Sequence, residues 1–302
     1  MKVLIVGAGV IGTVYGGSLG VAGDTVSVLQ HGPRTIDIAA NGLIARDAGS
    51  GDVMRAPVDV VADAGGEIYD FVLVAVRREQ LADACVSLLA LVGAPSILLL
   101  GNNPDGRSIV PDQLRSRLRL GFPGVGGTLV DGTVAYTRIK PQPTALEAVD
   151  DTHVAEFAAH LISRDFAVER IHDMEGWLAY HAVLVACICS ALDRCGTDTQ
   201  RLAGDRAMLR SLCHALTEGF AALRRRGVGG LPGNLRVLHS RMLTPIAAAY
   251  WSRTMRSPNG ELWFGAHARH AGAETRALSG DVLDRVGDDP MVPHLRELLR
   301  SA

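Results

Sequence analysis

The chain has 302 residues, with 30 Lys+Arg against 32 Asp+Glu and a formal net charge of -2. This near-neutral balance gives no reason to expect a nucleic-acid partner, and 48% hydrophobic with 21% charged residues excludes a disordered chain. Only two of the basic residues, Lys2 and Lys140, are lysines, so no chemistry after residue 140 can use a lysine. Five scattered cysteines, an odd number, do not indicate a disulfide framework, and we expect a cytoplasmic location.

Neither a targeting segment nor a membrane span is expected. The apolar run Val3 to Val6 directly follows Met1-Lys2 and is too short for a signal peptide. The longest apolar run, near Leu178 to Leu192, contains His181 and falls short of the ~18–20 residues that cross a bilayer. This run predicts a buried core helix, and we expect no membrane partner.

The first functional motif is a glycine-rich turn near the N-terminus. Residues 2–6 form an aliphatic run typical of a strand buried on both faces, and Thr13 to Ala22 has a helix-compatible pattern. Between them lies the G-x-G-x-x-G pattern, whose glycines allow a tight turn, the approach of a pyrophosphate, and close packing of the helix on the strand. The alternative is a glycine-rich turn in another kind of α/β protein. The candidate cofactor residues of this turn are Gly7, Ala8, Gly9, Val10, Ile11 and Gly12.

The end of the second predicted strand, Thr25 to Leu29, bears on the choice of cofactor. A site that prefers NAD usually has Asp or Glu here, accepting a hydrogen bond from the ribose 2′-hydroxyl. Gln30 occupies the position, so no carboxylate would repel a 2′-phosphate, and His31 and Arg34 are close enough in sequence to help bind one. The pattern favours NADP, with NAD as the alternative cofactor. Arg34 could instead be a solvated surface residue without a function.

The alternation of strands and helices continues through the first half. Asp70 to Val76 and Ser96 to Leu100 are predicted buried strands. Ligands of doubly wound sheets bind beyond the carboxyl ends of such strands, which places Arg77 and Asn102 at the cofactor crevice; the alternative role for either residue is loop capping. Segments within Gly121 to Thr144, and then Phe166 to Ile171, are predicted to complete the sheet of this domain.

The second half is helical. Its predicted helices are Glu175 to Leu192, Asp205 to Arg226, Asn234 to Arg256 and Gly260 to Val286. The predicted fold is therefore α/β, with a Rossmann-type doubly wound dinucleotide-binding domain at residues 1–171 and an all-α substrate and dimerisation domain at residues 172–302. A dehydrogenase of this organisation would place a small-molecule substrate between the two halves, and a homodimer is a possible assembly.

The chain resembles the ketopantoate reductase family over essentially its whole length. The resemblance is carried, in order, by Gly7 to Gly12, Asn41-Gly42-Leu43, Phe71 to Arg77, Leu98 to Asn102, Asp173 to Trp177 and Glu261. It implies the 6-phosphogluconate-dehydrogenase-like arrangement of a Rossmann-type and a helical domain. It also implies an oxidoreductase that uses NADPH to reduce the carbonyl of 2-dehydropantoate, with Asn102 near the nicotinamide and Glu261 as a late active-site glutamate.

The resemblance fails where the family has its proton donor. Family members use a lysine two residues after the tryptophan of the helical domain as general acid. That position is Ala179 here, and the family's asparagine one helical turn later falls on Val183. We therefore expect a carbonyl or imine substrate other than 2-dehydropantoate.

Other side chains are candidates for the missing acid and for the substrate pocket. His181 could donate a proton near neutral pH if the helix were rotated, and could act with Glu261; the alternative is a core histidine. Tyr180, Trp263 and His267 are candidate substrate contacts, although Trp263 is equally explained as a core residue. No metal is expected, because His267 and His270 have no evident third ligand.

Two further hypotheses remain open at this stage. One is a non-redox enzyme on the same scaffold: a cyclase, isomerase or dehydratase. The other is a nucleotide-binding protein without catalysis. The intact glycine turn and Asn102 favour the reductase, whereas the loss of the lysine and asparagine favours the two alternatives.

Overall fold

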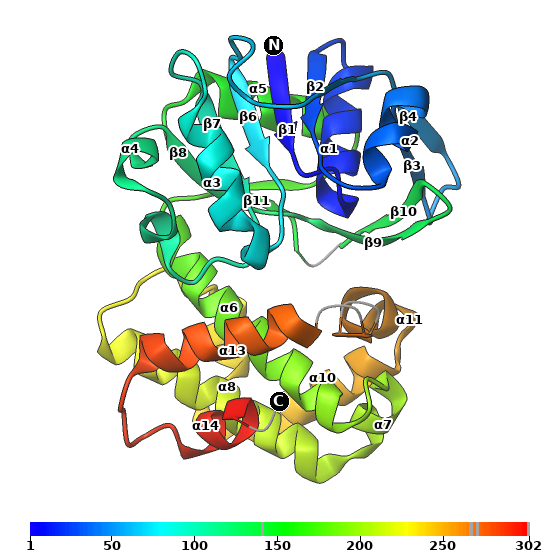
Figure 1. Ribbon diagram of the computed structural model, residues 1–302. Coiled ribbons are helices and arrows are strands. Elements are labelled where there is room, and N and C mark those ends of the chain that lie inside the picture. Colours follow the sequence, from blue (N-terminus) through cyan, green and yellow to red (C-terminus); the bar gives the residue numbers. More distant parts are fainter. Residues whose placement is uncertain (140–141, 266–267, 270–271, 301–302) are drawn as a thin grey trace. The chain divides into compact units, whose positions relative to one another are not determined.

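The computed structural model describes residues 1–139, 142–265, 268–269 and 272–300 (Figure 1). The chain forms two compact units. The first comprises Met1–Gly101 with Arg107–Met174, and the second comprises Asn102–Gly106 with Glu175–Ala302. The main boundary between the units in sequence follows Met174, whereas the sequence analysis placed it after residue 171. The short segment Asn102–Gly106 lies in the helical unit, which no sequence pattern indicated.

An eight-stranded sheet forms the centre of the first unit, in the order β12-β11-β8-β7-β6-β1-β2-β5. Its neighbouring strands are parallel except for β8 and β11. The strands are β1 (Lys2–Val6), β2 (Thr25–Leu29), β5 (Asp59–Val61), β6 (Phe71–Val74), β7 (Ser96–Leu100), β8 (Leu118–Phe122), β11 (Thr144–Glu147) and β12 (Val168–Ile171). The central strands are apolar throughout because both faces of the sheet are covered.

Helices cover both faces of this sheet, which confirms the predicted doubly wound α/β fold. α1 contacts α5, and α3 contacts α4 (Figure 1). The helices are α1 (Val10–Val21), α2 (Arg34–Asn41), η1 (Arg78–Gln80), α3 (Leu81–Leu89), η2 (Gly106–Ile109), α4 (Asp112–Arg115) and α5 (Thr152–Ser163). The chain leaves β1 toward β2 and returns to β6 on the other side, so the order reverses between β1 and β6. Such a reversal opens a crevice beyond the strand ends.

A second, four-stranded sheet corrects one expectation. Only β8 and β11 of the Gly121 to Thr144 region join the main sheet. The second sheet has the order β4-β3-β10-β9, with strands β4 (Val53–Ala56), β3 (Leu43–Asp47), β10 (Thr133–Arg138) and β9 (Val125–Val130). It packs against α1, where a Cβ on Gly17 would lie 2.5 Å from the Met54 side chain. An alternating pattern predicts a strand but not its partner, because pairing is set by distant contacts.

The second unit is helical, as predicted. Its elements are α6 (Met174–Arg194), α7 (Thr199–Gly204), α8 (Arg206–Arg225), α9 (Gly233–Leu238), η3 (Arg241–Leu243), α10 (Thr244–Arg256), α11 (Pro258–Gly260), η4 (a π-helix, Glu261–Gly265), α13 (Gly272–Val286) and α14 (Pro293–Arg300). The predicted helices Asn234 to Arg256 and Gly260 to Val286 are each interrupted, since Pro245 starts α10 and the π-turn η4 precedes α13.

α6 supplies much of the core of the second unit. By length and composition it could cross a membrane, but 78% of its most apolar window is buried within the structure. Burial of that kind is expected for the core helix of a globular unit, which is the role that the sequence predicted for it.

Candidate active site

The glycine turn after β1 needs each of its three glycines for a different reason. Gly7 has a φ of 89°, and a Cβ there would lie 2.7 Å from Val76 Cγ1. A Cβ on Gly12 would lie 2.0 Å from the carbonyl oxygen of Gly7, so only glycine lets α1 start this close to the turn. Gly9 has no atom within 4 Å of an added Cβ, so the space in front of it is open to a ligand.

The N-terminus of α1 adds hydrogen-bond donors to that open space. Gly9 is the N-cap, and no side chain caps the helix. The N–H groups of the first turn, from Val10 to Gly12, have no partner within a helix by its geometry. Uncapped N–H groups and the helix dipole together favour an anion, and a pyrophosphate is an anion of the kind that such a turn can hold.

Two side chains from the end of β2 lie against the same turn. The Ala8 N–H donates to Gln30 Oε1 at 2.8 Å, and the Arg34 guanidinium donates to the Ala8 carbonyl oxygen. Burial lowers the pKa of Arg34, but its guanidinium remains a cation at neutral pH. Arg34 Nε is buried without a hydrogen-bond partner in the described part of the chain. A cation with a spare donor thus lies where a 2′-phosphate would be read, whereas His31 is exposed.

Arg77 lies beyond β6, across the reversal point from the glycine turn. Its N–H donates to Gln80 Oε1 at 3.2 Å, which fixes the start of η1. Its side chain is more than half exposed and lies 4.0 Å from Glu79, a distance at which an exposed pair is weak. Arg77 therefore combines the capping role with a guanidinium that is available to a ligand at the strand ends.

Asn102 follows β7 by one residue and bonds to a carboxyl group that sequence reasoning missed. Asn102 Nδ2 donates to Glu274 Oε1 at 3.3 Å, and Glu274 lies in the first turn of α13. Asn102 Oδ1 is buried without a hydrogen-bond partner among the described residues. The two residues are 172 positions apart and share no motif. The only feature of the sequence that could have indicated Glu274 is its acidic side chain beside the buried face of a predicted helix.

Glu261 has other neighbours. Its carboxylate forms an ion pair with Arg269 and accepts a hydrogen bond from Thr199 Oγ1 at 3.3 Å. It lies in the π-turn η4 with its side chain 44% exposed. Asn102 therefore contacts Glu274, whereas Glu261 contacts Arg269. The structure gives Glu261 an evident role in joining η4 to α7.

His181 does not have the properties expected of a proton donor. It is buried on α6, and its ring stacks on Trp177 with the centroids 4.8 Å apart. Burial lowers the pKa of His181 to about 3, so the ring is neutral at physiological pH. The predicted role of His181 as a proton donor needs a protonated ring near neutral pH, whereas its lowered pKa favours the neutral ring.

Tyr180 is also a packing residue. Its hydroxyl donates to the Val228 carbonyl oxygen at 2.8 Å, and its ring meets Phe220 edge-on. Only 1% of the residue is exposed. A contact of Tyr180 with the substrate stays a prediction. Because its single hydroxyl proton is already used, the residue ties the end of α8 to α6.

The positions of the family's lysine and asparagine are part of the apolar core. Ala179 and Val183 are each 1% exposed and belong to the core cluster of the helical unit. Val183 packs where α8 comes closest, since a Cβ on Gly219 would lie 2.6 Å from Val183 Cγ1. A charged ammonium at either position would be desolvated, so the surrounding residues are fitted to apolar side chains.

The remaining predicted substrate contacts lie in or near η4. Trp263 meets Phe264 edge-on, and Phe264 in turn meets Trp251 edge-on, so Trp263 continues an aromatic cluster. It is partly exposed. His267 lies outside the described residues. Within the described ranges, no three His, Cys, Asp or Glu side chains gather in a way that could hold a metal ion.

Comparison with known proteins agrees with these features. The family model for ketopantoate reductase PanE/ApbA matches residues 3–134. No curated protein matches the chain in sequence. Among solved structures, the PanE/ApbA family ketopantoate reductase from Ralstonia eutropha JMP134 has a TM-score of 0.76 at 23% identity, over 100% of this chain and 97% of that one.

Two further structures broaden the comparison. The 2-dehydropantoate 2-reductase from Methylococcus capsulatus has a TM-score of 0.67 at 20% identity and covers 100% of this chain and 95% of its own. D-mandelate dehydrogenase, solved with NADH and anilino(oxo)acetate, has a TM-score of 0.74 at 16% identity, with 100% and 97% coverage. At these identities the likeness is one of fold.

Residues 3–134 thus match the family model of ketopantoate reductase PanE/ApbA, and the whole chain shares the fold of the solved ketopantoate reductases, so the resemblance drawn from the sequence is confirmed.

Proposed function

We propose that this protein is an NAD(P)H-dependent reductase of a carbonyl or imine substrate other than 2-dehydropantoate. The observation that carries the proposal is the open glycine turn: Gly9 leaves space in front of an uncapped helix N-terminus. The apolar surroundings of Ala179 and Val183 are the reason to look away from 2-dehydropantoate.

The residues of the first unit fit a dinucleotide. The N–H groups of Val10 to Gly12 would hold its pyrophosphate, and Arg34 would pair with a ribose 2′-phosphate. No carboxylate stands at the end of β2, so NADP is the preferred cofactor and NAD the weaker one. When bound, the reduced nicotinamide supplies a hydride. NADH in the solved D-mandelate dehydrogenase supports a redox role for this scaffold.

Asn102 and Glu274 are the residues proposed to act on the substrate. Asn102 Nδ2 holds Glu274 Oε1, and the unpartnered Asn102 Oδ1 can accept a hydrogen bond from an N–H or O–H of the substrate. For a carbonyl, the Glu274 carboxyl would have to deliver a proton to the oxygen as the hydride arrives. In ionised form, the same group would attract and orient a cationic substrate.

This arrangement favours a protonated imine as substrate. An iminium carbon accepts the hydride directly and yields a neutral amine, so no lysine is needed to protonate a developing alkoxide. Asn102 Oδ1 would accept the iminium N–H, and the Glu274 carboxylate would offset its positive charge. A keto acid is the second candidate, favoured by anilino(oxo)acetate in the solved D-mandelate dehydrogenase.

The test has two steps. The purified protein is titrated with NADPH and NADH, and cyclic imines, keto acids and ketones are then screened for loss of the reduced nicotinamide absorbance. We expect tighter binding of NADPH and turnover of a cyclic imine. Binding without turnover of any class would reject the reductase in favour of a non-redox or sensing role. Failure of both cofactors to bind would reject the nucleotide site itself.

Compartment and assembly complete the proposal. All five cysteines are free and buried, for example Cys213, whose pKa burial raises to about 12. A cytoplasmic location accommodates such thiols. We propose a homodimer formed through the helical unit, which light scattering of the purified protein would show as twice the chain mass.

A further inference from the structure

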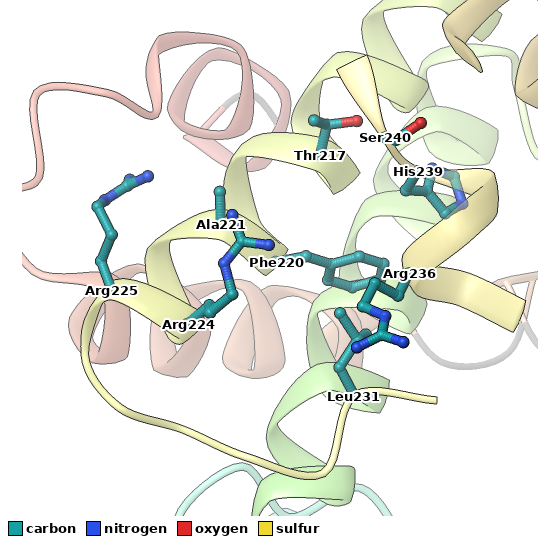
Figure 2. Close-up of a pocket in the computed structure, with 9 residues that line it drawn as sticks. All are labelled: Thr217, Phe220, Ala221, Arg224, Arg225, Leu231, Arg236, His239 and Ser240. Carbon is teal, nitrogen blue, oxygen red and sulfur yellow. The ribbon is translucent and has the colours of Figure 1, made fainter. Parts of the chain in front are cut away.

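A pocket of about 380 Å³ lies between α8 and α9, and neither Asn102 nor Glu274 lines it (Figure 2). We call it the α8–α9 pocket and define it by Phe220, Arg224, Leu231, Arg236 and His239. All five residues belong to the second unit. The volume lies in the range of pockets that hold small organic molecules.

The floor of the pocket is apolar and well supported. Phe220 is buried and meets Tyr180 and His239 edge-on, with ring centroids 5.6 Å apart in both pairs. Leu231 is partly buried and packs against the same core cluster. A floor of this kind favours a ligand with an apolar part and does not stabilise a small hydrated ion.

Two guanidinium groups lie at the mouth of the pocket around this floor (Figure 2). Arg224 comes from the last turn of α8, and Arg236 comes from α9. Neither has a carboxylate partner among the described residues. The adjacent Arg225 also lines the pocket, but its guanidinium pairs with Asp289 (Figure 2). The positive charges of Arg224 and Arg236 are therefore not balanced by a carboxylate of the described residues, whereas the charge of Arg225 is.

His239 adds a buried donor to the wall. Its Nε2 accepts a hydrogen bond from Trp251 Nε1 at 3.3 Å, so the ring proton of the neutral form is on Nδ1. Burial lowers the pKa of His239 to about 4, which keeps the ring neutral at physiological pH. His239 is only 5% exposed, and Nδ1 has no partner among the described residues. A buried N–H without an acceptor is unfavourable, and a ligand that lines up with it removes the penalty.

We propose that the α8–α9 pocket binds a small organic carboxylate with an apolar body. The carboxylate would take charge-assisted hydrogen bonds from Arg224 and Arg236 and the N–H of His239, while Phe220 and Leu231 would contact the apolar part. Inorganic phosphate matches the cations but not the apolar floor. The site uses none of the proposed catalytic residues, so it is independent of the identity of the reductase substrate.

The proposal is tested with phenylacetate as the probe, by calorimetry on the full chain. Phenylacetamide, which has the same body without the charge, and inorganic phosphate, which has the charge without the body, are the two comparisons. We expect measurable binding of phenylacetate and at least tenfold weaker binding of both comparisons, an effect of about the size of one charge-assisted hydrogen bond. Equal binding of phosphate, or no binding of phenylacetate, would overturn the proposal.

Matched variants locate the site. Arg236→Gln and Arg224→Gln should each weaken phenylacetate binding by about tenfold, since each removes one charge-assisted bond. Arg210→Gln, an exposed arginine on α8 outside the pocket, should leave it unchanged. NADPH binding in each variant shows whether the chain is folded. Undiminished binding by the Arg224→Gln, Arg236→Gln double variant would place phenylacetate elsewhere and overturn the assignment.

A second readout follows His239 directly. In ¹⁵N NMR spectra, phenylacetate should shift the Nδ1 resonance of His239 in the direction of a stronger hydrogen bond. The Arg236→Gln variant should need correspondingly more phenylacetate for the same shift. Saturation of binding without any change at His239 would remove that residue from the site and contradict the proposed contact.

Discussion

The glycine turn and helix α6 differ in how far they keep the features that the family resemblance implies. At the turn, Gly7, Gly9 and Gly12 each meet a geometric requirement of dinucleotide binding. On α6, Ala179 and Val183, to which the resemblance assigned the family's lysine and asparagine, are both buried in the apolar core. The first region keeps a geometry that fits a dinucleotide, and the second has no polar side chain at either position.

The difference shows that a cofactor site and a general acid depend on different features of a chain. A cofactor site depends largely on backbone geometry, which the glycines set. A general acid depends on one side chain, and a single substitution removes it. The proposed function rests on this difference: a nicotinamide-dependent reductase whose substrate needs a weaker acid.

The largest expected effect is at Gly12. Gly12→Ala places a Cβ against the Gly7 carbonyl oxygen, so α1 must move away from the turn. We expect loss of NADPH binding and a decrease of about 1–3 kcal/mol in the free energy of unfolding in urea. Gly9→Ala is the matched variant, because its Cβ enters open space: stability should be unchanged while NADPH binding weakens. Normal cofactor binding by both variants would show that the turn is not the nucleotide site.

The next effect is at Glu274, the carboxyl group proposed to act on the substrate. Glu274→Gln should lower turnover about 100-fold, the usual contribution of a general acid or base, with NADPH affinity unchanged. Asp284→Asn, at an exposed position on the same helix, is the control. Glu261→Gln tests the rival carboxylate. If turnover falls in that variant and not in Glu274→Gln, the family's glutamate is the working acid and our assignment is wrong.

A smaller effect is expected at Arg34. Arg34→Gln should weaken NADPH by about 10-fold to 100-fold, as for one charge-assisted contact, and leave NADH nearly unaffected. Isothermal titration with both cofactors measures the ratio, and Arg46→Gln, an exposed arginine on β3, controls for overall charge. Equal weakening of both cofactors would mean that Arg34 only braces the Ala8 carbonyl and reads no phosphate.

The smallest effect on activity is expected at His181. Because its pKa falls from 6.5 to about 3 on folding, the unfolded chain takes up a proton between these values and the folded chain does not. The stabilisation from the neutral ring is full above pH 6.5 and decreases as the pH falls, by about 1.4 kcal/mol per pH unit. In His181→Phe this contribution to the slope should vanish between pH 5 and about 6, with turnover at neutral pH unchanged.

Urea unfolding across this pH range measures the slope. His239 contributes a similar slope in both proteins, since its pKa is also lowered, so only the His181 share should disappear. A large drop in turnover of His181→Phe at neutral pH, with an unchanged slope of stability, would restore His181 as proton donor.

Much of the fold could be predicted from local patterns. The strands Thr25 to Leu29 and Ser96 to Leu100 have the predicted bounds, because buried parallel strands are continuous apolar runs closed by polar residues. The second sheet could not be predicted, since β3 and β10 are far apart in sequence and pair where both contact α1. Periodicity identifies an element but does not identify its partner.

The candidate site divides in the same way. The roles of Gly7, Gly9 and Gly12 follow from spacing alone, because a turn is local in sequence. The hydrogen bond from Asn102 to Glu274 joins the loop after β7 to α13, and no nearby sequence pattern predicts it. The lowered pKa of His181 could not be predicted from its sequence neighbours, because its burial depends on the whole helical core.

The most direct test of the central claim follows the hydride itself. NADPH carrying deuterium at the transferable position of the nicotinamide is incubated with the protein and each substrate class, and the products are analysed by mass spectrometry. We predict one deuterium on the former carbonyl or imine carbon, strongest for a cyclic imine, and unlabelled product from Gly12→Ala. Absence of deuterium from every product, in a protein that binds NADPH, would contradict the account.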